Sequence, residues 1–245
     1  MEGPELRRIG QGLVEYALVL ALLVLVVVLA LTAMGVSTQQ AFSKVVEALG
    51  VKQVSSCEIL YQSQFDRGMN EWSPLTGGFW KGGWRIIDGR LVGESLAAAI
   101  LDTVNETDYI VTAEAIKLEM LRSTYQGFGI IFRASVHKQK LSGYMFEIEK
   151  KNAADRGLMY FSKWVKGYQI FPPLASVEVP SRFDWSKISQ MRIVAQGDTF
   201  IAFVDGQEVL RVQDSTYTQG KAGVAVNYGS RATINNFSIA SVGCP

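Results

Sequence analysis

Residues 199–212 read TFIAFVDGQEVLRV and predict a β-hairpin. β-branched and aromatic residues, which favour strands, stand on both sides of Asp205-Gly206. An Asp-Gly dipeptide suits the type I′ turn, the tight turn that joins antiparallel strands. A second such dipeptide, Asp88-Gly89, lies between Ile87 and Arg90. The two hairpins indicate an antiparallel sheet.

The same pattern extends through residues 58–245. Short β-rich segments recur at regular intervals and are separated by Gly, Asn, Asp and Ser. We expect strands over residues 60–65, 84–87, 90–93, 98–101, 109–118, 127–133, 144–149, 157–164, 188–195, 199–204, 207–212, 222–227 and 233–240. About a dozen strands at this spacing predict an antiparallel β-sandwich of the jelly-roll kind.

The composition of the chain excludes several function classes. Its 245 residues include 24 Lys and Arg against 23 Asp and Glu, so the net charge of +1 offers no general attraction to nucleic acid. One His and two Cys are too few for a His/Cys zinc site, and they allow a Cys/His nucleophile pair only if Cys57 or Cys244 acts with His137. We expect no cofactor and no metal.

The N-terminal part differs in character. No charged side chain occurs from Tyr16 to Ser43, and this length suits a helix that spans a bilayer. We therefore expect an α+β chain, with one long N-terminal hydrophobic α-helix over residues 11–50 followed by the all-β antiparallel jelly roll. A secretory signal peptide or a simple anchor is the alternative, although the apolar core is long for a signal and leaves Glu15 unexplained.

Residues 7–21, RRIGQGLVEYALVLA, resemble the prepilin motif of Flp (Tad, type IVb) pilins. Gly10, Glu15 and Tyr16 stand at that family's spacing, and Tyr16 together with the absence of Pro between Pro4 and Pro74 favours a major pilin. The resemblance implies a leader over residues 1–10 that a prepilin peptidase removes, which leaves Gln11 as the new N-terminus. Glu15 would then pair with the α-ammonium of Gln11 and set the register of a filament.

Residues 57–245, joined to the helix by a linker over residues 51–56, resemble a concanavalin A-like lectin/glucanase domain. Phe65-Asp66 with Trp72 and the segment 84–91 (WRIIDGRL) are similar to its opening. Trp185 and the segments 191–194, 203–209, 220–226 and 234–237 are similar to its closing half. The likeness implies a fold that hosts binders, glycosidases and inert spacers, and it does not choose among them.

Cys57 and Cys244 bracket this domain. The first and last strands of a jelly roll commonly lie side by side, so we expect a disulfide between these two residues. Two unpaired cysteines are the alternative.

Glu147 and Glu149 are the strongest catalytic candidates. In glucanases of the resembled fold, carboxylates alternate along one strand as Glu-x-Asp-x-Glu or Glu-x-Asp-x-x-Glu and share a face. Here Glu149 replaces the Asp, and Lys151 and Asn152 stand where the third carboxylate belongs. We therefore expect a strand with a solvated charged face and no enzyme activity.

Glycan binding has a separate signal. Sugars stack on exposed aromatic rings, and residues 57–245 hold five Trp. Trp80 lies between turn residues, and Trp164 lies near Tyr168 in a segment that suits the rim of a groove. We expect these three side chains to bind a surface glycan; the alternative is that the Trp residues pack in the core.

Two hypotheses follow. In the first, the chain is the major subunit of an extracellular Tad/Flp-like pilus, held in the inner membrane before assembly, with copies of itself, the prepilin peptidase and the assembly machinery as partners. In the second, it is a membrane-anchored carbohydrate-binding or glycoside-hydrolase-like module that does not polymerise.

Overall fold

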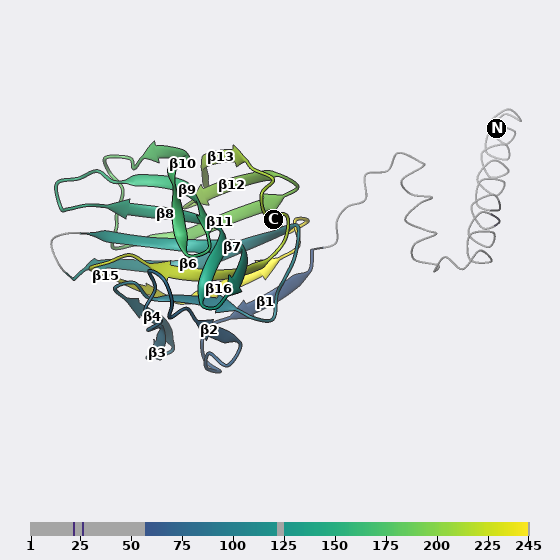
Figure 1. The fold of residues 1–245 in the computed structure, drawn as a ribbon, viewed down its shortest axis with the longest axis horizontal. Coiled ribbons are helices and arrows are strands. Elements are labelled where there is room, and N and C mark those ends of the chain that lie inside the picture. The colour runs from purple at the N-terminus through teal and green to yellow at the C-terminus, as the bar shows by residue number, and fades with distance from the viewer. Residues whose placement is uncertain (1–21, 23–25, 27–56, 122–124, 245) are drawn as a thin grey trace, which may run out of the picture. The chain divides into compact units, whose positions relative to one another are not determined.

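The computed structural model describes residues 57–121 and 125–244, together with Leu22 and Val26. The described residues form an all-β antiparallel sandwich of two sheets (Figure 1). The expected jelly-roll architecture is confirmed for residues 57–121 and 125–244. Contacts along the chain separate two units, residues 1–54 and residues 55–245, and the sandwich is the second unit.

The α+β class is wrong for the part of the chain that the structure describes, because its elements are all strands. Of the helix expected over residues 11–50, only Leu22 and Val26 are described; both are helical and exposed, and the other positions lie outside the described residues. Among the described positions, no helix has the length and hydrophobicity to cross a membrane.

One sheet has nine strands. Seven of them follow the order β13-β12-β11-β6-β15-β4-β3, and β16 pairs with both β6 and β1. Their bounds are β1 Ile59–Ser63, β3 Arg85–Ile87, β4 Arg90–Glu94, β6 Tyr109–Met120, β11 Ile188–Gln196, β12 Thr199–Val204, β13 Gln207–Gln213, β15 Ser230–Ile234 and β16 Asn236–Ala240.

The other sheet has seven strands in the order β10-β9-β8-β7-β14-β5-β2. Their bounds are β2 Trp72–Pro74, β5 Ala98–Leu101, β7 Gln126–His137, β8 Lys140–Lys150, β9 Leu158–Val165, β10 Tyr168–Glu178 and β14 Lys221–Val226. This sheet carries the site described below, because its outer face is only partly covered.

Both predicted Asp-Gly turns are present. Asp88-Gly89 joins β3 to β4, and Asp205-Gly206 joins β12 to β13. All four residues have positive φ, as a type I′ turn requires: 51° and 69° in the first turn, 50° and 79° in the second. Glycine and aspartate were therefore reliable signals for where these strands reverse.

Strand β10 was not predicted. The pair Pro172-Pro173 in its middle breaks the pattern of a strand, because proline cannot donate a ladder hydrogen bond. The structure accommodates both prolines because β10 is an edge strand and its pairing with β9 shifts register between Ile170 and Ala175. The peptide bond between Phe171 and Pro172 is cis.

The core lies between the two sheets. It is built from alternate residues of each strand, with Phe128, Phe132, Tyr144, Phe146 and Phe161 among the fully buried rings from the seven-stranded sheet. Because side chains alternate between faces, the residues between these rings point to the outer face. Packing of the inner face stabilises the sandwich, so the outer face of the sheet is available to form a binding site.

The two ends of the sandwich are joined. Strand β1 pairs with β16, and Cys57 and Cys244 form a disulfide with their Cα atoms 4.4 Å apart. The predicted bridge is confirmed. It closes a loop with a sequence separation of 187 residues, so it restricts the unfolded chain strongly.

Replacing both cysteines by serine is expected to lower the free energy of unfolding by about 2–5 kcal/mol, because the unfolded chain regains the entropy of the open loop. Chemical denaturation of the double variant and of the wild-type chain, each with and without reducing agent, measures the effect. A reducing agent should weaken only the wild-type chain. Equal stability of the two oxidised proteins would contradict this account.

Candidate functional site

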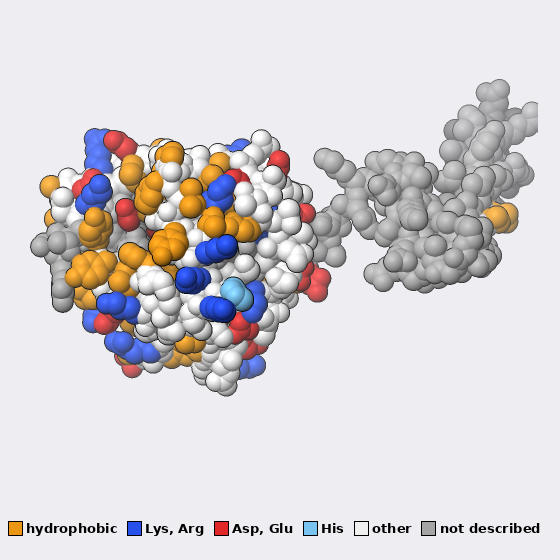
Figure 2. Space-filling model, in the orientation of Figure 1, with side chains coloured by type: hydrophobic (Ala, Val, Ile, Leu, Met, Phe, Trp, Pro, Cys, Tyr) orange, Lys and Arg blue, Asp and Glu red, His pale blue; other side chains and the backbone are white. Residues whose placement is uncertain are grey.

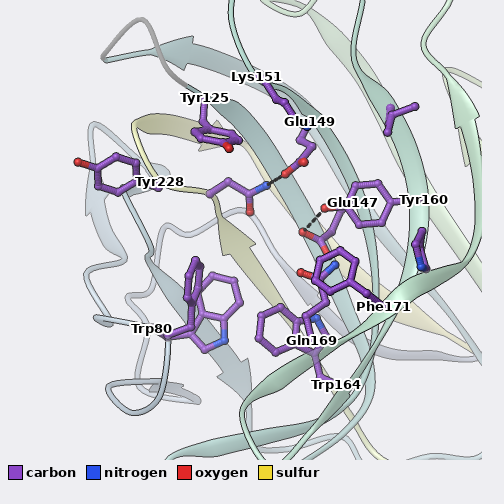
Figure 3. A pocket seen from close by; sticks show the side chains of 14 residues that line it. Trp80, Tyr125, Glu147, Glu149, Lys151, Tyr160, Trp164, Gln169, Phe171 and Tyr228 are labelled. Atoms are coloured by element: carbon purple, nitrogen blue, oxygen red, sulfur yellow. Dashed lines mark hydrogen bonds between the residues drawn. The ribbon is translucent and has the colours of Figure 1, made fainter.

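A groove of about 500 Å³ lies on the outer face of the seven-stranded sheet, a size within the range of about 300–1,000 Å³ that is typical of ligand pockets. Figure 2 shows hydrophobic side chains gathered over this part of the molecule, with Lys and Arg beside them. The lining residues are Phe79, Trp80, Tyr125, Glu147, Glu149, Lys151, Leu158, Tyr160, Trp164, Gln169, Phe171, Pro173, Asn227 and Tyr228 (Figure 3).

Two carboxylates form the floor of the groove. In β8, Phe146 and Ile148 point into the core, so Glu147 and Glu149 point to the outer face, as the alternation of the strand predicts. Glu147 pairs in register with Gly129 of β7, where a methyl group would lie 2.6 Å from Met145 Sδ and 3.1 Å from Glu147 Cγ. The missing side chain on β7 therefore makes room first for Met145 and then for the glutamate.

Glu147 is almost completely buried, with 2% of its surface exposed. The Ser162 hydroxyl donates to Glu147 Oε1 at 2.6 Å, and the Tyr160 hydroxyl donates to Oε2 at 3.1 Å. Ser162 in turn accepts a hydrogen bond from Trp164 Nε1 at 3.1 Å. The expectation of a solvated charged face is therefore wrong at Glu147, because neighbouring strands and the groove wall exclude water from it.

Glu149 lies nearer the surface and is held by Asn227, whose Nδ2 donates to Glu149 Oε2 at 2.8 Å. Among the described residues, no lysine or arginine forms an ion pair with Glu147 or Glu149. The floor thus carries two carboxyl groups that form no ion pair with a described lysine or arginine, although the charge of Lys151 favours the ionised form of Glu149.

The electrostatics follow from this burial. Desolvation raises the pKa of Glu147 to about 7, the Ser162 hydrogen bond opposes that rise, and the negative charge of Glu149 adds to it. Burial also raises the pKa of Glu149. The protonated form of Glu147 is therefore substantially populated near neutral pH, where it can donate as well as accept a hydrogen bond.

The raised pKa of Glu147 makes stability depend on pH. The folded protein binds this proton more tightly than the unfolded chain, so the stabilisation is complete below pH 4.5 and is lost as pH rises to about 7. We expect the wild-type chain to lose about 2–3 kcal/mol of unfolding free energy across this interval relative to Glu147→Gln. Urea unfolding of both proteins at pH 5 and pH 8 measures the difference; parallel pH profiles would refute it.

Trp80 and Trp164, which were predicted to bind a glycan, both line the groove, but they form its buried wall and are not exposed rings. Their rings lie 5.3 Å apart, and only 3% of Trp80 and 4% of Trp164 is exposed. The expected exposure of Trp80 is wrong, because the segment that carries it folds onto the outer face of the sheet and packs against Leu141 and Met145.

Tyr168 is 71% exposed but does not line the groove. It pairs with Val165 in register, while the next residue, Gln169, pairs with Trp164 and lines the groove. Because neighbours on a strand point to opposite faces, Tyr168 points away from Trp164. Its predicted role in glycan binding is untested, and its position does not favour that role.

Three exposed aromatic rings at the groove were not predicted from the sequence. Phe79, Phe171 and Tyr228 line it, and Phe171 is 73% exposed. Each stands beside a glycine or a proline in the sequence, which marks a turn or a strand break where a side chain can project. The neighbouring glycine or proline is visible in the sequence, but it does not show which face of the sheet the ring occupies.

The other predicted positions lie elsewhere. Gly10, Gln11, Glu15 and Tyr16 lie outside the described residues. His137 is exposed at the end of β7, away from the groove. Among the described side chains, no group of three His, Cys, Asp or Glu is placed to hold a metal ion.

Known structures share this fold. A carbohydrate-binding module, CBM66 from Bacillus subtilis, matches with a TM-score of 0.56 and 19% identity over 71% of this chain and 97% of that chain. The endo-β-1,3-glucanase from Pyrococcus furiosus matches with a TM-score of 0.55 and 12% identity over 76% and 94%. A Bacillus subtilis protein of unknown function with a galectin-like fold has a TM-score of 0.51 and 17% identity over 75% and 96%.

No protein-family model matches the sequence. No curated protein is significantly similar to it. At these identities the structural likeness shows the fold alone. The described sandwich is a jelly roll of the kind found in galectin-like proteins, carbohydrate-binding modules and glucanases.

Proposed function

We propose that the sandwich is a carbohydrate-binding module that holds β-glucan in the groove and does not hydrolyse it. The observation that carries this proposal is the combination of exposed aromatic rings with a polar floor in one groove. Aromatic rings bind the apolar faces of sugars, and a small number of polar groups binds the hydroxyls.

The groove supplies both kinds of contact. Phe171 and Phe79 present exposed rings at its border, and Tyr228 adds a third. Glu149 and Asn227 offer an acceptor and an amide to hydroxyl groups on the floor. The choice of β-glucan rests on the fold, since endo-β-1,3-glucanases are among the similar structures.

The absence of hydrolysis is proposed from the β8 sequence. Retaining glycosidases need a nucleophile and a general acid that flank the scissile bond. The third position of the glucanase pattern is Lys151, whose side chain lines the groove. A lysine is not the carboxylic acid that the pattern places there to protonate the leaving group, so the residue suits binding better than proton transfer.

The filament hypothesis depends on residues 7–50, almost all of which lie outside the described residues, and no comparison supports it. The Cys57–Cys244 bridge favours an oxidising compartment, so we propose that the sandwich works outside the cytosol.

The exposed rings of β10 provide a matched pair of variants. Phe171→Ala is expected to weaken binding of the full-length chain to laminarin, a β-1,3-glucan, about three- to tenfold, because one stacking ring is lost. Tyr168→Ala removes an equally exposed ring from the same strand and should leave the affinity unchanged. Affinity electrophoresis and calorimetry measure both. A larger loss in Tyr168→Ala than in Phe171→Ala would place the site elsewhere.

Incubation of laminarin or lichenan with the full-length chain is expected to release no new reducing ends, because the groove lacks a third carboxylate. An active endo-β-1,3-glucanase serves as the positive control for the assay. If reducing ends appear and Glu147→Gln abolishes their release, the protein is a glycosidase and the non-catalytic part of the proposal is wrong.

A further inference from the structure

The segment 75–81 crosses the outer face of the seven-stranded sheet. Its two ends are hydrogen-bonded beside β5, where Leu75 N donates to Ala98 O and Lys81 N donates to Leu96 O, each at 2.9 Å. Between these ends the segment reaches the turn between β7 and β8, where Thr76 N donates to Gln139 Oε1 at 3.1 Å. We call residues 75–81 the crossing loop.

The tip of the crossing loop fits closely against two turns of the sheet. A methyl group at Gly77 would lie 2.8 Å from the Gln139 carbonyl oxygen, and one at Gly78 would lie 3.5 Å from the Gly167 carbonyl oxygen. Gly167 belongs to the turn between β9 and β10. The loop therefore extends from β5 to the β9–β10 turn and leaves little space beneath its tip.

Trp80 fills the space between the crossing loop and the sheet. It belongs to a buried cluster on the outer face that contains Leu75, Trp80, Ala98, Ile100, Ile131, Ala134, Leu141, Met145, Trp164 and Ala225. Small residues of β5 and β14 make room for the indole. This end of the outer face is thus packed like a core and cannot admit a ligand.

The groove ends at this cluster. Strand pairing places Ala98, Ala225, Gly129, Glu147 and Tyr160 in one row across the sheet. The first two belong to the cluster with Trp80, and the last two line the groove, so the row passes from the covered part into the open part. In Figure 3 the rings of Trp80 and Trp164 stand at one side of the cavity, opposite Lys151.

A second cavity, of about 460 Å³, lies beyond the crossing loop. Leu75, Ile100, Ala134 and Gln139 line it, and among the described residues it shares no lining residue with the groove. The loop therefore divides the outer face into two separate cavities instead of leaving one cleft open at both ends.

From this division we infer that the groove receives one end of a glucan chain, not an internal stretch, with the terminal sugar against Trp80 and Trp164. The inference rests on the proposed function and specifies which part of the glycan is bound. An internal stretch that lies along β8 and β9 needs an exit at each end, and the packed cluster closes the end at Trp80 and Trp164. The opposite border, at Lys151 and Leu158, is exposed and gives the rest of the chain its way out.

The test counts binding sites per gram of glucan for the full-length chain. Linear β-1,3-glucans of increasing length, from laminaripentaose to a high-molecular-mass polymer, are titrated calorimetrically at equal mass concentration, and a cyclic β-glucan provides a chain without ends. End recognition predicts that a chain of twice the length shows half as many sites per gram, and that the cyclic glucan does not bind.

Trp80→Ala supplies a second measurement, because loss of the indole opens the closed end. The variant is expected to bind the cyclic glucan and to show a number of sites per gram that no longer depends on chain length. Trp84→Ala is the control: Trp84 packs against the main core and does not line the groove, so its loss should leave the length dependence intact.

The outcomes separate the inference from the function on which it rests. If sites per gram of the wild-type chain do not change with glucan length, or if the cyclic glucan binds as well as linear chains, end recognition is wrong and glucan binding stands. If no linear glucan binds, glucan binding is wrong and the inference fails with it. The wild-type titration decides these outcomes even if Trp80→Ala does not fold.

Discussion

The alternation of side chains along β7, β8 and β9 is the constraint on which the rest of the structure depends. One set of residues, with Phe128, Phe146 and Phe161, packs into the sandwich core. The other set, with Glu147 and Tyr160, faces outward into the groove. Because the two sets are interleaved, a shift of one residue in register would place carboxylates in the core and phenyl rings in the groove. Packing of the core therefore also positions the site.

The polar outer face includes a buried carboxyl group, Glu147, whose removal from water is energetically unfavourable. Glu147 is removed from water without a described cation beside it, and two hydroxyl groups satisfy its oxygens instead. A buried carboxylate responds by holding its proton, which is why its pKa rises to about 7. This arrangement suits recognition of hydroxyl groups, because the side chain can accept or donate with a small change in protonation.

The aromatic residues of the site divide by exposure into two roles. Trp80 and Trp164 are buried and give the groove a rigid wall, while Phe79, Phe171 and Tyr228 are exposed at its border. Only the exposed rings can stack on a sugar without rearrangement of the protein. The crossing loop links the two roles, since Phe79 and Trp80 are consecutive residues that point to different surroundings.

Local patterns in the sequence determined most of the strands, both Asp-Gly turns, the shared face of Glu147 and Glu149 and the pairing of Cys57 with Cys244, because each depends on neighbouring residues or on the chain ends of a recognisable fold. They missed β2 and β10 and did not separate β15 from β16. Only the tertiary structure decided which aromatic rings are exposed and that Glu147 is buried, since burial depends on segments far apart in the chain. The same reason explains why β10, with its two prolines, was missed: its place at the sheet edge removes the need for the hydrogen bonds that proline cannot donate.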